Sequence, residues 1–341
     1  MSENKEKKQL LIYVMIAYGV TFLMGLFIWY GNSKGMDVSV FPAAQMMYPA
    51  AGVMFAYLCT GEENLPKGYY ITFLIVTGVM ILLSFLSLFV PVEMELLEKM
   101  GLTFWSMISQ YVLILGSIAL WIVLLATKKE KRRAYGLGFF NGKASVFCVL
   151  LFLILYVGRT AFSCLIGGQM GEFAELLKSP ATWISTALLP VNFFLVFAAF
   201  FGEEYGWRYY LQPLMQKKFG NRAGVILLGI VWGLWHLPLD FWYYSDTGLA
   251  MSAAQQITCI TLGIFFAYAY MKTGNIWVPV ALHYLNNNLI PIFSGNYSAD
   301  VLENQTIAWG DLPAALLINL VFFGLFIFAK PFRERGSISQ Q

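Results

Sequence analysis

Charged residues are scarce in this sequence. Only 12% of its 341 residues are Asp, Glu, Lys or Arg, and 59% are hydrophobic. A soluble globular domain carries about 25% charged residues. With a mean hydropathy of +0.65, the chain holds more apolar side chains than one water-soluble core can bury. The scarcity of charge therefore excludes a soluble domain and predicts an integral membrane protein that crosses the bilayer several times.

Histidine and cysteine are also rare, with two and four residues. No CxxC pair is present, which argues against a cysteine metal site. Each cysteine lies in or at the end of an apolar stretch, so we interpret the four as small hydrophobic residues rather than as a disulfide framework. They are Cys59, Cys148, Cys164 and Cys259.

Ten stretches are long and apolar enough to cross a bilayer, which takes about 20 residues. They are 9–30, 39–60, 69–92, 102–126, 145–166, 183–207, 223–243, 253–271, 276–293 and 311–329. No small-residue cleavage site follows the charged leader, so the first stretch is predicted to be a retained helix rather than a signal peptide.

Lysine and arginine indicate the orientation of these stretches. If the N-terminus is cytoplasmic and the connections alternate, nearly all Lys and Arg residues fall inside. Only Lys34, Lys99 and Lys178 fall in the outside connections. This bias agrees with the positive-inside rule. We therefore predict an all-α, polytopic membrane protein with about ten transmembrane helices and with both termini in the cytoplasm.

The ionisable residues divide the chain near residue 144. The four apolar stretches before it have none in their middles, and every charge at membrane depth comes after it. We predict an N-terminal four-helix transmembrane region over 1–144 and a catalytic transmembrane domain over 145–335. The segment 169–178 is predicted to be a short interfacial helix. We interpret the basic run at 128–133 as a topology anchor near anionic lipid, not as a nucleic-acid site.

Ionisable side chains at membrane depth are costly, so each is a candidate for function. The set comprises Arg159, Glu203, Glu204, Arg208, His236, Asp240 and His283. The helix rise of about 1.5 Å per residue places Glu203, His236 and His283 at one level, about 15–20 Å from the cytoplasmic boundary. A carboxylate and two imidazoles from three helices are therefore predicted to meet in one layer.

The local spacing suggests roles for the carboxylates. Glu204 and Arg208 are four residues apart and share a helical face, so Arg208 can neutralise the buried Glu204. Glu203 points about 100° away and is predicted to lack an ionic partner. Such a carboxylate suits a general base that shares a water molecule with His236.

The third helix adds donors. His283 and Asn287 are also four residues apart and offer an N–H and an amide group on one face. Two donors opposite a base form the arrangement that amide hydrolysis needs, with an activated water and an oxyanion hole.

Structural interpretations compete with this one. The acidic pair and Arg208 could be an ion cluster that ends a helix, and both histidines could be packing residues. Asp240 follows Pro238, which is expected to kink the helix, and its role is open between function and pairing near the outer leaflet. Arg159 is expected to snorkel or to pair with a carboxylate. Asn286 and Asn288 are interpreted as helix-packing residues.

Three motifs occur in order on three of these stretches: EEYGWR at 203–208, WGLWH at 232–236 and HYLNN at 283–287. They resemble the EExxxR, FxxxH and HxxxN or HxxxB pattern of the CPBP family of intramembrane proteases. This family, also called Abi, includes the type II CAAX prenyl endopeptidases. The resemblance covers about residues 180–295. One departure is Trp232, which stands where the family usually has Phe and keeps an aromatic wall.

The resemblance implies roles for three pairs. Glu203 and His236 are expected to activate the attacking water. His283 and Asn287 are expected to stabilise the oxyanion, and Glu204 and Arg208 to organise the site. No cofactor is expected, although two histidines and a glutamate could hold zinc. The expected partners are a peptide or lipidated protein substrate and membrane lipid, not nucleic acid. The expected location is a bacterial or archaeal plasma membrane.

These observations favour an intramembrane endopeptidase of the glutamate type. One alternative is a proton-coupled transporter with Glu203, Glu204 and His236 as a relay, but the sequence lacks the internal repeat that transporters often show. Another is a catalytically idle family member that acts as a scaffold or in bacteriocin immunity.

Overall fold

The computed structural model describes residues 3–244, 246–296 and 306–333. Helices dominate these residues, and no strand occurs among them. Within the described ranges, 7 helices are long and apolar enough to cross a membrane: Glu3–Ser33, Lys67–Phe89, Phe104–Ala126, Gly142–Ile166, Pro180–Phe219, Asn221–Trp242 and Gly248–Thr273. The prediction of an all-α, polytopic membrane protein is confirmed.

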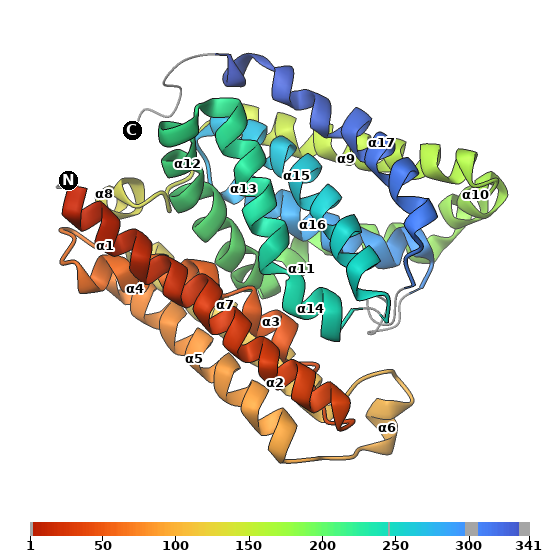
Figure 1. The fold of residues 1–341 in the computed structure, drawn as a ribbon, viewed down its shortest axis with the longest axis horizontal. Helices are drawn as coiled ribbons and strands as arrows, with labels where there is room; N and C mark the ends of the chain where they lie inside the picture. Colours follow the sequence, from red (N-terminus) through yellow and green to blue (C-terminus); the bar gives the residue numbers. More distant parts are fainter. Residues whose placement is uncertain (1–2, 245, 297–305, 334–341) are drawn as a thin grey trace.

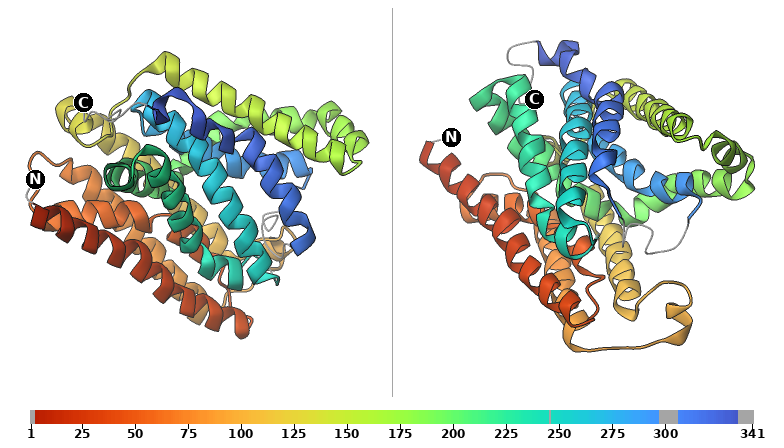
Figure 2. Two further views of the ribbon diagram at one scale, coloured as in Figure 1. Left: turned by 45° about the horizontal axis from the view of Figure 1, so that its top comes forward. Right: turned by 45° about the vertical axis from the view of Figure 1, so that its right-hand side comes forward.

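The helices lie in three layers (Figure 1). Residues 3–126 form one side, and α11 (Pro180–Glu204) to α16 (Trp277–Ser294) form the middle. The opposite side is formed by α9 (Gly142–Ile166) and α17 (Leu312–Phe322). Both views in Figure 2 show the same order. The middle layer therefore has neighbours on both sides, which explains how charged side chains on it are kept from lipid.

Three of the ten predicted spans are shorter or more polar than the rest. The prediction of one helix over 39–60 is wrong, because the chain turns at Met46–Met47 between α3 (Phe41–Gln45) and α4 (Tyr48–Cys59). Each of these helices has a proline in its first turn, which favours a helix start and disfavours a helix interior. The stretch 276–293 is one helix, whereas 311–329 passes from α17 into 3₁₀ turns. The count of ten stays a prediction.

Opposite charges gather at opposite ends of the molecule. Figure 1 places the start of α1 (Glu3–Val14), the basic α8 (Lys129–Ala134) and the end of α12 (Gln212–Phe219) at one end. The acidic α6 (Glu95–Glu98) and α10 (Met170–Lys178) lie at the other end. The helix expected over 169–178 is thus present, while the cytoplasmic side of the basic end stays a prediction.

Helix geometry changes at the acidic motif. Helix α11 continues without a break into a π-helical segment, η2 (Tyr205–Leu211), and then into α12. Such π-bulges occur frequently at functional sites. In the next helix, α13 (Asn221–Trp235) ends before His236, and α14 (Leu237–Trp242) begins with Pro238 in its first turn. The helix is thus interrupted beside the proline that was expected to kink it, and His236 lies at the junction.

All four cysteines are free, as predicted. Cys148 and Cys259 are buried, in keeping with our interpretation of them as small hydrophobic residues, whereas Cys164 is half-buried and Cys59 is exposed.

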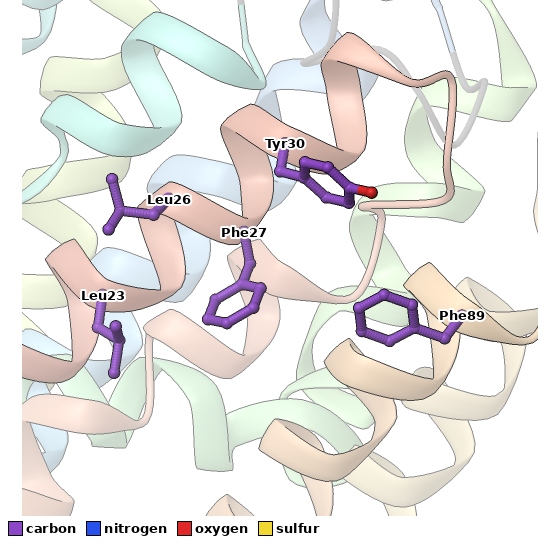
Figure 3. Close-up of a pocket in the computed structure, with 5 residues that line it drawn as sticks. All are labelled: Leu23, Leu26, Phe27, Tyr30 and Phe89. Atoms are coloured by element: carbon purple, nitrogen blue, oxygen red, sulfur yellow. The ribbon is translucent and has the colours of Figure 1, made fainter.

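Two open grooves are present on the described surface. One, of about 400 Å³, lies between α2 (Thr21–Ser33) and the end of α5 (Lys67–Phe89), and Figure 3 shows its lining: Leu23, Leu26, Phe27, Tyr30 and Phe89. The other, of about 410 Å³, lies between α11 and α16. Its lining is Ser185, Leu188, Leu189, Val191, Asn192, Leu195, Asn288, Pro291 and Ile292. Mostly apolar linings of this kind suit contact with hydrocarbon.

Gly202 on α11 and Gly206 on η2 allow this continuous helix to lie close to the layer formed by residues 3–126. A Cβ atom on Gly202 would lie 2.8 Å from the Cα of Met47, and one on Gly206 would lie 2.8 Å from the carbonyl carbon of Pro49. Both neighbours are backbone atoms, which cannot rotate away as a side chain can. The residues on either side of position 144 therefore pack closely, and the domain boundary there stays a prediction.

We expect Gly202→Ala and Gly206→Ala each to destabilise the protein by about 1–3 kcal/mol or more, because the neighbouring backbone must move to make room for the added methyl group. The measurement is the midpoint of unfolding of the purified chain in detergent. Gly78→Ala, in the middle of α5, is the control, since a Cβ there meets nothing within 4 Å and alanine is the better helix former. Equal midpoints for all three variants would contradict this account of the packing.

Candidate active site

Six side chains from the middle layer form one buried cluster. They are Glu203 and Glu204 at the end of α11, Arg208 on η2, Trp232 on α13, His236 after it, and His283 on α16. None of the six is more than 8% exposed. Buried charges persist only when they are paired or hydrogen-bonded, so the contacts of each group decide what the cluster can do.

Glu204 is bonded through both of its oxygen atoms. The Nε of Arg208 donates to Glu204 Oε2 at 2.9 Å, and the Nδ1 of His283 donates to Glu204 Oε1 at 2.9 Å. The pairing of Glu204 with Arg208 was predicted, whereas its bond to His283 on another helix was not. No periodicity in the sequence signals that second bond, because it depends on how α16 is rotated against α11.

The guanidinium of Arg208 also faces aromatic rings. Its Cζ lies 4.8 Å from the ring centroid of Trp232 and 5.6 Å from that of Phe266. Its Nη1 and Nη2 make no hydrogen bond to the described residues. Cation–π attraction is strong where water is excluded, so the two rings partly replace the missing partners.

Glu203 is hydrogen-bonded but not ion-paired. Its Oε2 accepts a hydrogen bond of 2.8 Å from the indole Nε1 of Trp232. The expectation that Glu203 lacks an ionic partner holds for the direct contacts of its carboxylate, whereas its bond to Trp232 was not predicted. An indole N–H cannot take a proton or cancel a charge. Glu203 is therefore oriented and keeps its acceptor character.

His236 is held by the same tryptophan. Its Nδ1 lies 2.9 Å from the carbonyl oxygen of Trp232, and because a carbonyl only accepts, this nitrogen carries the proton. In the neutral ring Nε2 is then an acceptor. The Sγ of Cys259 lies 3.8 Å from the same Nδ1. The free acceptor atom of His236 is therefore Nε2.

The Nδ1 of His283 bonds to a carboxylate, whereas the Nδ1 of His236 bonds to a backbone carbonyl. The Nδ1 proton of His283 is committed to the carboxylate of Glu204, so its Nε2 carries a proton only when the ring is an imidazolium. Asn287 follows one turn later and is half-buried. Its Oδ1 accepts from Asn286 Nδ2 at 3.0 Å, which turns the Asn287 Nδ2 away from Asn286.

Two candidates at membrane depth, Asp240 and Arg159, lie outside the cluster. Asp240 is fully buried, and neither of its carboxylate oxygens has a hydrogen-bond partner among the described residues, so the pairing considered for it is not seen. Arg159 Nη1 donates to Asn319 Oδ1 at 3.2 Å and its guanidinium lies 4.6 Å from the ring of Tyr156. Of the two alternatives predicted for Arg159, pairing with a carboxylate is not seen among the described residues, where an amide and a ring contact it instead, and snorkelling stays a prediction.

Asn288 has the packing role that was expected of it. Its Oδ1 accepts from Asn192 Nδ2 at 3.4 Å across to α11, and its Nδ2 donates to the carbonyl of Tyr284 at 2.9 Å. Interhelical amide bonds of this type stabilise helix contacts in membranes.

The ligand atoms do not gather as a metal site in the described part of the chain. There, no three side chains of His, Cys, Asp or Glu are grouped so that they could hold a metal ion. Glu204 is committed to Arg208 and His283, and the Nδ1 atoms of both histidines are engaged. Bonds of this kind at Nδ1 leave the Nε2 of each histidine able to bind a metal, but no third ligand is grouped with them among the described residues, and we derive no step through zinc. The expectation of a reaction without a cofactor stays a prediction.

Comparison with known proteins identifies the region that holds the cluster. Residues 184–289 match the family described as type II CAAX prenyl endopeptidase Rce1-like. The chain is also 35% identical over 109 residues to CAAX prenyl protease 2 of Methanococcus maripaludis. That alignment covers 32% of this chain and 39% of the relative, so the chain spans well under half of the curated protein it matches. No solved structure matches the chain.

Proposed function

We propose that this chain is an intramembrane endopeptidase of the CPBP family, because its residues 184–289 match the type II CAAX prenyl endopeptidase Rce1-like family. The proposed reaction is hydrolysis of a peptide bond in a membrane-associated or lipidated peptide or protein. One observation carries the proposal: Glu203, His236 and His283 come from three helices and meet around Trp232. The name of the Methanococcus maripaludis relative, CAAX prenyl protease 2, supports the same chemistry.

Glu203 and His236 activate the attacking water in this proposal. The carboxylate of Glu203 accepts a proton from the water, while the Nε2 of His236 accepts a second hydrogen bond and aligns it. General base catalysis requires such a group within hydrogen-bond reach of the proton that it removes. The hydroxide equivalent then attacks the carbonyl carbon, and a tetrahedral intermediate with a negatively charged oxygen forms.

His283 and Asn287 stabilise that oxygen. Because Glu204 holds the Nδ1 proton of His283, an imidazolium at this position presents Nε2–H to the substrate. Two carboxylates, one guanidinium and one imidazolium then sum to no net charge in the cluster. The amide Nδ2–H of Asn287 is the second donor. Donors that are already oriented stabilise the transition state more than mobile ones do.

The leaving amine takes the proton that Glu203 removed from water. The carbon–nitrogen bond breaks, and the products are a carboxylic acid and an amine, with the base restored. One residue that serves first as a base and then as an acid needs no further titrating group.

A direct assay tests the proposed function. The purified full-length chain in lipid nanodiscs is incubated with a library of prenylated and unprenylated membrane peptides, and new peptide ends are identified by mass spectrometry. Cleavage supports an endopeptidase and shows whether the lipid is required. Proton-coupled solute flux in proteoliposomes without any cleavage would favour the transporter, and neither activity would favour the idle scaffold.

Removing one oxyanion donor is a narrower test. We expect Asn287→Ala to lower kcat about 10²-fold with little change in KM, because this donor acts on charge that appears only in the transition state. Asn288→Ala is the control, since this neighbouring amide bonds to Asn192 and Tyr284 instead. A kcat for Asn287→Ala equal to that of the control would remove Asn287 from the oxyanion hole.

A further inference from the structure

We propose that Trp232 is a positioning residue that holds the two water-activating groups, Glu203 and His236, in their reactive orientations. The inference rests on the proposed function. It concerns two separate bonds of one residue, the indole N–H to Glu203 and the backbone carbonyl to His236.

Trp232 contacts both groups directly. Its Nε1 lies 2.8 Å from Glu203 Oε2, and its carbonyl oxygen lies 2.9 Å from His236 Nδ1. Glu203 belongs to α11, whereas His236 follows α13 one turn after Trp232. A single residue thus ties a carboxylate on one helix to an imidazole at the end of another. The distance between Glu203 and His236 therefore depends on the position of the Trp232 backbone and on the direction of the Trp232 ring.

The ring itself cannot swing freely. The guanidinium of Arg208 lies over it at 4.8 Å, and Phe266 lies beside it with ring centroids 6.2 Å apart. The ring of His283 meets it in a T-shaped contact at 5.6 Å, and Trp232 is 3% exposed. Packing on several sides fixes the direction of the N–H, which is what a positioning residue needs.

The bond keeps Glu203 from a competing orientation. Arg208 is the cation of the cluster, and a carboxylate in a dry site is drawn strongly toward a guanidinium. A Glu203 turned onto Arg208 would be neutralised as a base. The indole N–H holds one oxygen in place and leaves the second for the water. Phenylalanine, which the motif usually has here, donates no hydrogen bond, so this restraint is a feature of this chain.

The alternative is that Trp232 only fills space. Phenylalanine would then serve equally well, because it preserves an aromatic wall beside Arg208 and His283. Two changes separate the roles. Trp232→Phe removes the N–H and part of the ring, and incorporation of 3-benzothienylalanine at position 232 exchanges the N–H for sulfur while keeping the shape of the bicyclic ring.

The experiment compares cleavage kinetics of the full-length chain in nanodiscs. We expect both changes to lower kcat about 10- to 100-fold with KM within about 2-fold, because hydrogen bonds to an ionised group are strong and this one orients the base without binding substrate. Trp277→Phe is the matched control, since its buried indole donates to the carbonyl of Leu137 at 3.2 Å. That variant is expected to lose similar stability and to keep its kcat.

The outcomes separate this inference from the proposed function. If the wild-type chain cleaves peptide and both position-232 changes leave kcat unaltered, Trp232 is a packing residue and the inference is wrong. If KM rises while kcat stays constant, Trp232 binds substrate and the inference is likewise wrong. If the wild-type chain cleaves nothing under any condition, the proposed function fails and the inference fails with it.

Discussion

Glu203→Gln is expected to lower kcat for peptide cleavage about 10³–10⁴-fold while the chain stays folded. The amide cannot accept a proton from water or pass one to the leaving amine, and general acid–base groups contribute up to about this factor. Glutamine still offers an oxygen to the Trp232 indole, which lies 2.8 Å from Glu203 Oε2. The loss should therefore be chemical rather than structural. Initial cleavage rates test the loss of activity. The unfolding midpoint of the same preparation tests whether the chain stays folded.

Glu203→Asp is the matched control for this change. It keeps a carboxylate but shortens the side chain, so we expect partial activity between that of the wild type and that of Glu203→Gln. His236→Ala should lose activity to a degree similar to Glu203→Gln, because effects of groups that act on one water are not additive. Substantial cleavage by both Glu203→Gln and His236→Ala would rule out the water-activating role of this pair.

Glu204→Gln is expected to destabilise the folded chain by about 3–5 kcal/mol, because removing one partner of a buried ion pair leaves the other charge uncompensated. Arg208 is fully buried and its Nη atoms already lack hydrogen-bond partners among the described residues. The amide also removes the charge that holds the Nδ1 proton of His283. The midpoint of unfolding in detergent is the measurement, and peptide cleavage should be lost as well.

Two further variants test whether an uncompensated buried charge causes the loss of stability in Glu204→Gln. The double change Glu204→Leu with Arg208→Met removes both charges and should recover much of the lost stability, because an apolar pair carries no desolvation penalty. Glu175→Gln breaks a surface ion pair of similar length, 2.8 Å to Lys178, and should change the midpoint little because water screens it. A double variant less stable than Glu204→Gln would contradict the argument from uncompensated charge.

Several features follow from local patterns in the sequence. The scarcity of charge required a membrane protein, and the spacing of Glu204 and Arg208 placed them on one helical face. Pro238 interrupted its helix where the pattern predicted, and the helix after Gln169 was found. Each depends on composition or on neighbours within about one turn, and such short-range effects are the same in any fold.

Other features depend on contacts between distant segments. The two-helix structure of 39–60, the bond from Glu204 to His283 and the bond from Trp232 to Glu203 could not be read from spacing. A helical period gives the face on which a residue lies, but not the rotation of one helix against another or the direction of an indole N–H.

The amino-acid sequence by itself therefore determined that this is an all-α membrane protein, and it predicted which carboxylate and imidazoles share a level. Only the tertiary structure decided which atoms meet: Glu204 is hydrogen-bonded to His283, and Trp232 is hydrogen-bonded to both Glu203 and His236. The physical reason is that depth accumulates residue by residue along one helix, whereas side-chain contacts require several helices to pack in a single register.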